Sequence, residues 1–111
     1  MNWKEQVKTE LDQAGAASEA RNEGKARVCA RRAAGYVIGE YLRRKELPII
    51  SSSVYTRLQY LRSLPDISPQ VREVTDHFLV RITPDHTLPV EVDLLAEVRW
   101  LVNELLGDII E

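Results

Sequence analysis

The chain has 111 residues, of which 44% are hydrophobic and 29% are charged, and its formal net charge is −2. This length and composition predict one globular domain over residues 1–111 and exclude an intrinsically disordered chain. No apolar run approaches the roughly 20 residues of a membrane span, residues 1–5 contain no apolar signal core, and the single cysteine excludes an intrachain disulfide and a cysteine metal cluster. We therefore expect a cytoplasmic protein without a metal or a cofactor.

The first helix is expected to begin directly after Asn2. Asparagine is a favoured N-cap, and Glu5 follows it at the capping-box position. Apolar residues then recur at helical spacing. The polar stretch 19–24 is expected to end the helix, with Gly24 as the residue after the C-cap, because glycine readily adopts the left-handed backbone found there.

The second helix is expected over residues 25–44 and is the central helix of the fold, because its apolar face is wide. Gly35 and Gly39 lie four positions apart on this helix. Each glycine costs about 1 kcal/mol relative to alanine in a helix interior. We expect this cost to be offset by the close approach of a neighbouring backbone, in this chain or in a second copy.

Three further helices are expected over residues 54–64, 69–80 and 89–106. The serines at 51–53 offer an N-cap for the first of these, and Ser68 followed by Pro69 is a strong start signal for the second. Gly107 is expected to end the last helix. Because the connections are short, the sequence predicts an all-α, mostly up-and-down antiparallel bundle of about five helices.

Charge is distributed unevenly along the chain. Residues 21–45 hold eight Lys and Arg against two Glu, whereas residues 82–111 hold seven Asp and Glu against one Arg. One interpretation is that the two segments attract each other, within the chain or across a dimer. The other is that the basic segment, with Arg27, Arg31 and Arg32, binds an anionic partner such as RNA.

Several segments together resemble the HEPN superfamily of small helical proteins. They are the long helix beginning at 25–36, the serine-capped third helix, the segment 64–69 before the fourth helix, and the proline-containing loop 81–85. The loop is similar to that family's Arg-Tyr-Pro-Asp segment, with Thr83 inserted and no tyrosine. The resemblance covers roughly residues 3–106 and implies a HEPN-like bundle.

The resemblance also implies a homodimer and a role in a toxin–antitoxin or defence system, with a minimal nucleotidyltransferase as partner. Active members of the family are metal-independent ribonucleases with an Arg-x4–6-His motif. This sequence has two matches to that motif, Arg72 with His77 and Arg81 with His86. A histidine can move a proton to or from a ribose hydroxyl, and an arginine can hold the phosphate.

The neighbouring residues argue against catalysis by these pairs. Five positions along a helix give a net rotation of about 140°, so Arg72 and His77 are not expected to share a face. Glu73 and Asp76 would also repel a phosphate. The alternative to catalysis is that His77 is a partly buried helix residue and that His86 is an exposed loop residue.

Three functions remain open from the sequence. The preferred hypothesis is a dimeric, HEPN-like interaction protein without catalysis, which binds a partner protein or a nucleotide. The alternative hypothesis is a metal-independent endoribonuclease that uses one of the Arg-x4-His motifs. A third hypothesis is RNA binding through residues 21–45 without cleavage.

Overall fold

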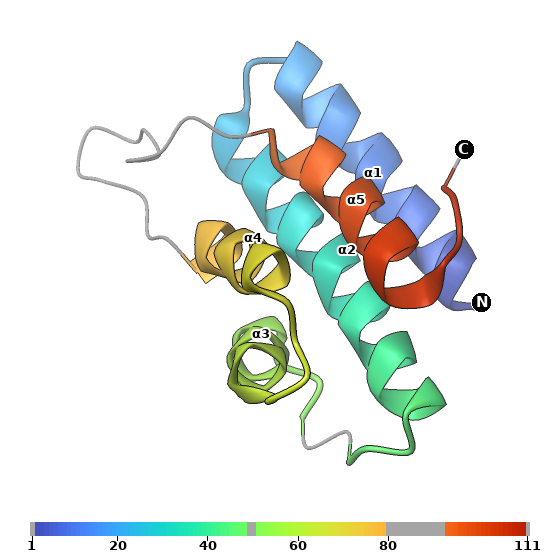
Figure 1. The fold of residues 1–111 in the computed structure, drawn as a ribbon. Coiled ribbons are helices and arrows are strands. Elements are labelled where there is room, and N and C mark those ends of the chain that lie inside the picture. The colour runs from blue at the N-terminus through green and yellow to red at the C-terminus, as the bar shows by residue number, and fades with distance from the viewer. Residues whose placement is uncertain (1, 49–50, 80–92, 111) are drawn as a thin grey trace.

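The structure is a computed structural model that describes residues 2–48, 51–79 and 93–110. Within these ranges the chain forms five helices and no strand, which confirms the predicted all-α bundle (Figure 1). The helices are α1 (Trp3–Glu19), α2 (Glu23–Arg44), α3 (Val54–Ser63), α4 (Pro69–Leu79) and α5 (Leu94–Leu106).

Four of the predicted capping residues begin or end their helices as expected. The side chain of Asn2 accepts a hydrogen bond from the Glu5 backbone N–H at 2.8 Å. Ser53 caps α3, and Ser68 accepts from the first turn of α4. Gly107 ends α5 in the left-handed conformation, with φ of 61°. Local side-chain chemistry therefore sets these boundaries.

The boundary between α1 and α2 differs from the prediction. Gly24 does not follow the C-cap of α1 but lies in the first turn of α2. Helix α1 ends earlier, and Arg21 adopts the left-handed conformation with φ of 61°. The reason is Asn22, whose side chain accepts a hydrogen bond from the Lys25 backbone N–H at 3.2 Å and so begins α2 two residues sooner.

The start of the last helix also differs from the prediction. The expected start at Pro89 lies outside the described residues, as does Val80 at the expected end of the fourth helix. In the described part of the chain α5 begins at Leu94. Asp93 precedes it in an extended conformation and accepts a hydrogen bond from the Ala96 backbone N–H, so this carboxylate is the N-cap.

Helix α2 packs along α1 and also against α5, whereas α1 and α5 touch only slightly (Figure 1). Helix α1 is antiparallel to both of the others, and α5 runs in the same direction as α2. In this view α3 is seen almost along its axis, so it crosses α2, and α4 packs between α3 and α5. Helix α2 touches α1, α3 and α5 and is the central helix, as its wide apolar face predicts.

The core lies where these helices meet. Val37 of α2, Phe78 of α4 and Leu101 of α5 are fully buried in it. Leu95 and Leu105 of α5 are only partly buried and pack at its margin. The core thus joins residues from helices that are far apart in the sequence, and burial of this apolar surface is the main favourable term in folding.

The two glycines of α2 accommodate side chains of α3 rather than a neighbouring backbone. A Cβ atom on Gly35 would lie 3.0 Å from a methyl group of Val54. A Cβ atom on Gly39 would lie 2.6 Å from Nη1 of Arg57. The expected close approach therefore exists, but it is made by side chains within this chain.

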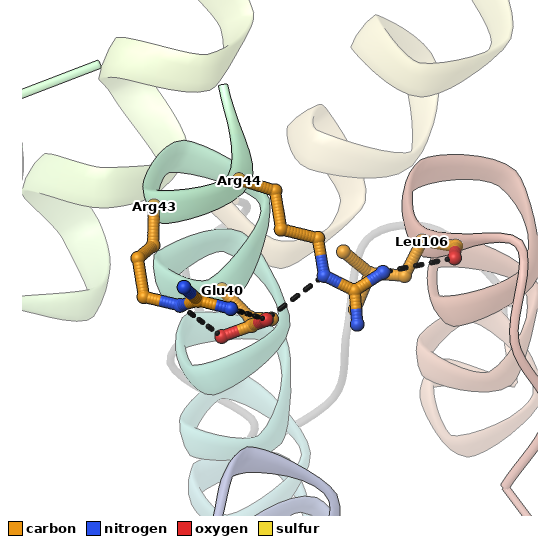
Figure 2. A network of polar contacts seen from close by, with 4 residues as sticks. All are labelled: Glu40, Arg43, Arg44 and Leu106. Carbon is orange, nitrogen blue, oxygen red and sulfur yellow. Dashed lines mark hydrogen bonds and ion pairs between the residues drawn. The ribbon is translucent and has the colours of Figure 1, made fainter. Parts of the chain in front are cut away.

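One end of the bundle is held by a buried carboxylate (Figure 2). Glu40 accepts from Nη2 of Arg43 at 2.6 Å and from Nε of Arg44 at 2.8 Å. Arg44 also donates to the carbonyl oxygen of Leu106 at the end of α5, and its guanidinium lies over the Trp3 ring of α1. The network therefore joins the last turns of α2 and α5 to the first turn of α1.

The attraction expected between the basic and acidic segments stays a prediction. In the ranges that the structure describes, no ion pair joins residues 21–45 to residues 93–110. Arg44 meets a backbone carbonyl of α5, while Asp108 pairs with Lys4 of α1 at 2.8 Å.

None of the described helices combines the length and the apolar composition that crossing a bilayer requires.

Candidate functional site

Arg72 of the first motif is directed toward the end of α3. Its Nε lies 3.4 Å from the carbonyl oxygen of Arg62, and its Nη2 lies 3.3 Å from that of Leu64. The last carbonyl groups of a helix have no hydrogen-bond partner within that helix. An arginine side chain can donate hydrogen bonds to them. Arg72 therefore holds the turn between α3 and α4.

His77 of the same motif faces α5 instead. Its Nδ1 lies 2.6 Å from Oε1 of Glu97, and the two side chains are 20% and 19% exposed. His77 is thus a partly buried helix residue, as the alternative to catalysis predicts. Because Arg72 meets α3 and His77 meets α5, the structure does not bring the two side chains together within one chain.

His77 and Glu97 lie in a groove between α4 and α5. The groove has a volume of about 480 Å³ and is lined by Gln70, Glu73, Val74, His77, Ala96, Glu97 and Trp100. Val74, Ala96 and Trp100 form its apolar part, whereas Glu73, Glu97 and His77 supply its polar and charged groups. We take this groove as the candidate functional site, because it combines apolar surface with a few convergent polar side chains.

The surroundings of Glu97 disfavour the ionised form of its carboxyl group. Burial raises its pKa above the ordinary value, and the negative charges of Glu73 and Asp93 act in the same direction. The hydrogen bond and the charge of His77 oppose this shift. Oε2 of Glu97 is buried and has no hydrogen-bond partner in the described part of the chain. A hydrogen-bond donor or a positive charge beside Glu97 would therefore stabilise its ionised form.

The three arginines proposed for RNA binding do not form one exposed basic surface. Arg27 is only 7% exposed, and its Nε is buried with no partner among the residues described. Arg31 donates from Nε to the carbonyl oxygen of Phe78 at 3.0 Å and lies over the Tyr55 ring. Of the three, Arg32 is the one that is exposed.

The remaining predicted residues add no site in the described ranges. Arg81 and His86 lie outside the described residues, so the second motif stays a prediction. Over residues 2–48, 51–79 and 93–110, no three or more His, Cys, Asp or Glu side chains gather in a way that could hold a metal ion. Cys29 is buried and packs in the interior.

Sequence reasoning missed Glu97 as a functional residue. It precedes the exposed Arg99 and follows the cap Asp93, so it resembles an ordinary acidic residue in the first turn of a helix. Its pairing with His77 spans 20 positions and depends on how α4 packs against α5. No local spacing in the sequence carries that information.

Comparison of the chain with protein-family models, with curated proteins and with solved structures finds no match. The resemblance to the HEPN superfamily therefore stays a prediction from the sequence.

Proposed function

We propose that this chain is a non-catalytic interaction protein that binds a basic side chain of a partner protein in the groove between α4 and α5. The observation that supports this is the pairing of acidic groups with apolar surface in one groove. Glu73 and Glu97 would attract an arginine or lysine head group, and Val74 and Trp100 would contact its aliphatic stem. An arginine over the Trp100 ring would gain a cation–π contact.

The separation of Arg72 from His77 supports binding over catalysis. A ribonuclease of the expected type needs a cation at the phosphate and an imidazole at the reacting hydroxyl. Here Arg72 already donates to two carbonyl oxygens of α3, and Glu97 engages the imidazole. A binding function is compatible with the proposed homodimer and with a protein partner such as a minimal nucleotidyltransferase. Sedimentation at micromolar concentration tests the homodimer, and a purely monomeric protein would contradict it.

The groove is tested by the binding of a short arginine-containing peptide, measured by calorimetry. Replacing Glu73 by Gln removes one groove carboxylate and should weaken binding about tenfold, because hydrogen bonds to charged groups contribute about 1.5–3 kcal/mol. Glu104 is exposed on α5 and does not line the groove, so Glu104→Gln is a control with the same change of charge.

Equal affinities of wild type, Glu73→Gln and Glu104→Gln would contradict binding in the groove. Loss of affinity in both variants to the same extent would show that the peptide responds only to overall charge. The folded state of each variant is checked by its circular dichroism melting curve.

The second candidate function is a metal-independent endoribonuclease. It is favoured by the 2.6 Å contact between His77 and Glu97, because a carboxylate that holds one ring nitrogen orients the imidazole for general acid–base chemistry. This function predicts RNA cleavage that persists in EDTA and is lost in His77→Ala plus His86→Ala. The interaction function predicts no cleavage above a buffer control.

A further inference from the structure

A second hollow lies between α2 and the start of α3, away from the groove described above. Its volume is about 310 Å³, and it is lined by Arg32, Gly35, Tyr36, Ser52, Val54 and Arg57. Two of these side chains are arginines and two carry hydroxyl groups, while none is a carboxylate. The hollow is therefore positively charged and rich in hydrogen-bond donors.

Arg57 is fixed in this hollow by the backbone. Its Nε donates to the carbonyl oxygen of Ser51 at 2.9 Å, and its Nη1 donates to that of Gly35 at 2.9 Å. An arginine has five N–H donors, so these two bonds leave others for a ligand. Gly39 leaves room for this position, because a Cβ atom there would lie 2.6 Å from Nη1 and the guanidinium would have to shift. The guanidinium is thus held in place before any ligand binds.

The two arginines of the hollow lack a counter-charge. Neither Arg32 nor Arg57 forms an ion pair with a residue in the described part of the chain. By contrast, Arg43 and Arg44 both pair with Glu40. Two neighbouring cations without a carboxylate repel each other, and a bound anion would remove that repulsion.

The three serines before α3 make different contacts. Ser53 caps the helix by accepting from the Thr56 backbone N–H, and the hydroxyl of Ser51 accepts from the Ser53 backbone N–H. Ser52 lines the hollow instead, as does Tyr36 of α2. The hydroxyl of Ser52 is therefore a donor available to a ligand, as in many sites that bind phosphate oxygens.

We propose that this hollow binds the phosphate group of a small phosphate monoester. Arg57 and Arg32 would hold the phosphate oxygens, since a guanidinium fork matches them in geometry and charge, and the hydroxyl of Ser52 would donate a third bond. The volume is at the lower end of the range for small-molecule sites, which fits a phosphate with a small organic group beside Tyr36. This site does not depend on the α4–α5 groove.

The test is a titration of the 15N-labelled protein with adenosine monophosphate, with inorganic phosphate and with adenosine, at constant ionic strength. The two phosphates should shift the amide signals of Gly35, Tyr36 and Ser52, and adenosine should not. Tighter binding of the nucleotide than of inorganic phosphate assigns the organic group to the site. Equal binding of the two would overturn the assignment to a phosphate monoester and leave the phosphate alone as the ligand.

Arg32→Gln should weaken phosphate binding about tenfold, since it removes one charge-assisted contact. Lys25→Gln is the matched control, because Lys25 is exposed on the same helix and does not line the hollow. Arg57→Lys keeps the charge but loses the fork and should also weaken binding. If Arg57→Lys does not fold, Arg32→Gln decides the question.

Absence of any shift with phosphate or nucleotide up to about 10 mM, a range in which even weak specific binding is seen, would overturn the proposal. So would the same affinity in Arg32→Gln as in Lys25→Gln. Variants of Glu73 in the α4–α5 groove should leave the phosphate titration unchanged, so failure of one site is distinguishable from failure of the other.

Discussion

At the scale of single residues, Glu97 is the clearest case in which burial and a neighbour act against each other. Burial raises its pKa, and the hydrogen bond from His77 lowers it. Replacing His77 by Phe keeps a ring of similar size but removes the hydrogen bond and the charge. The pKa of Glu97 should then rise further, as measured by NMR titration of its carboxyl carbon.

The Glu73→Gln variant should move the same pKa in the opposite direction. The negative charge of Glu73 raises the pKa of Glu97, so its removal should lower that pKa. If His77→Phe left the titration of Glu97 unchanged or shifted it to lower pH, the 2.6 Å contact would not govern this carboxylate.

At the scale of the elements, glycines with and without neighbours give a matched comparison. Gly15 lies inside α1 with nothing within 4 Å of an added Cβ, whereas an added Cβ on Gly39 would collide with Arg57. Gly15→Ala should stabilise the fold by about 0.5–1 kcal/mol through helix propensity. Gly39→Ala should lose that gain, because Arg57 must leave its place over α2.

Chemical denaturation of the two variants measures this difference. Equal stabilisation by both substitutions would show that Arg57 moves aside at no cost, and that its two hydrogen bonds to backbone carbonyls contribute little. A loss of stability in Gly15→Ala would contradict the open space beside α1.

Helix boundaries were largely predictable because they depend on neighbouring residues. Asn2, Ser53 and Gly107 act through bonds to backbone groups three or four positions away, which the sequence displays directly. The α1–α2 boundary was mispredicted because two signals compete there, and the Asn22 cap prevails over Gly24. Sequence alone does not rank such signals.

At the scale of the whole molecule, Glu40 holds Arg44 of its own helix, and Arg44 in turn links α2 to α5 and α1 at one end of the bundle. The hydrogen bond from Arg43 is the largest influence on Glu40, burial opposes this, and Arg44 adds to it, so that the pKa falls from 4.5 to about 2. A carboxylate with a lowered pKa stabilises the fold above the unfolded value, and this contribution is lost as the pH falls from about 4.5 towards 2.

Glu40→Gln should therefore destabilise the protein by about 1–2 kcal/mol at neutral pH, since it removes a charge that accepts from two arginines. The difference from wild type should shrink at pH 3, where much of this pH-dependent contribution of Glu40 has been lost. Urea denaturation at both pH values measures it. The same difference at both pH values would mean that the effect comes from packing and not from the charge.

The candidate site was less predictable than the fold, since it depends on contacts between helices that are distant in sequence. His77 was identified from a motif, but its partner Glu97 lies on another helix. The expected partner Arg72 instead donates to a carbonyl oxygen at the end of α3. Arg32 and Arg57 likewise line one hollow because α3 packs across α2. Periodicity predicts which residues of a helix are buried, but it does not predict which side chains of different helices come together.

The most direct test of the interaction function is a fluorescence titration of the α4–α5 groove. In Trp3→Phe, Trp100 is the only indole of the chain and reports on the groove that it lines. A short peptide with one arginine should change its emission in a saturable way, and the same peptide with neutral citrulline at that position should not. An equal response to both peptides, or to neither, would contradict binding of a basic side chain in the groove.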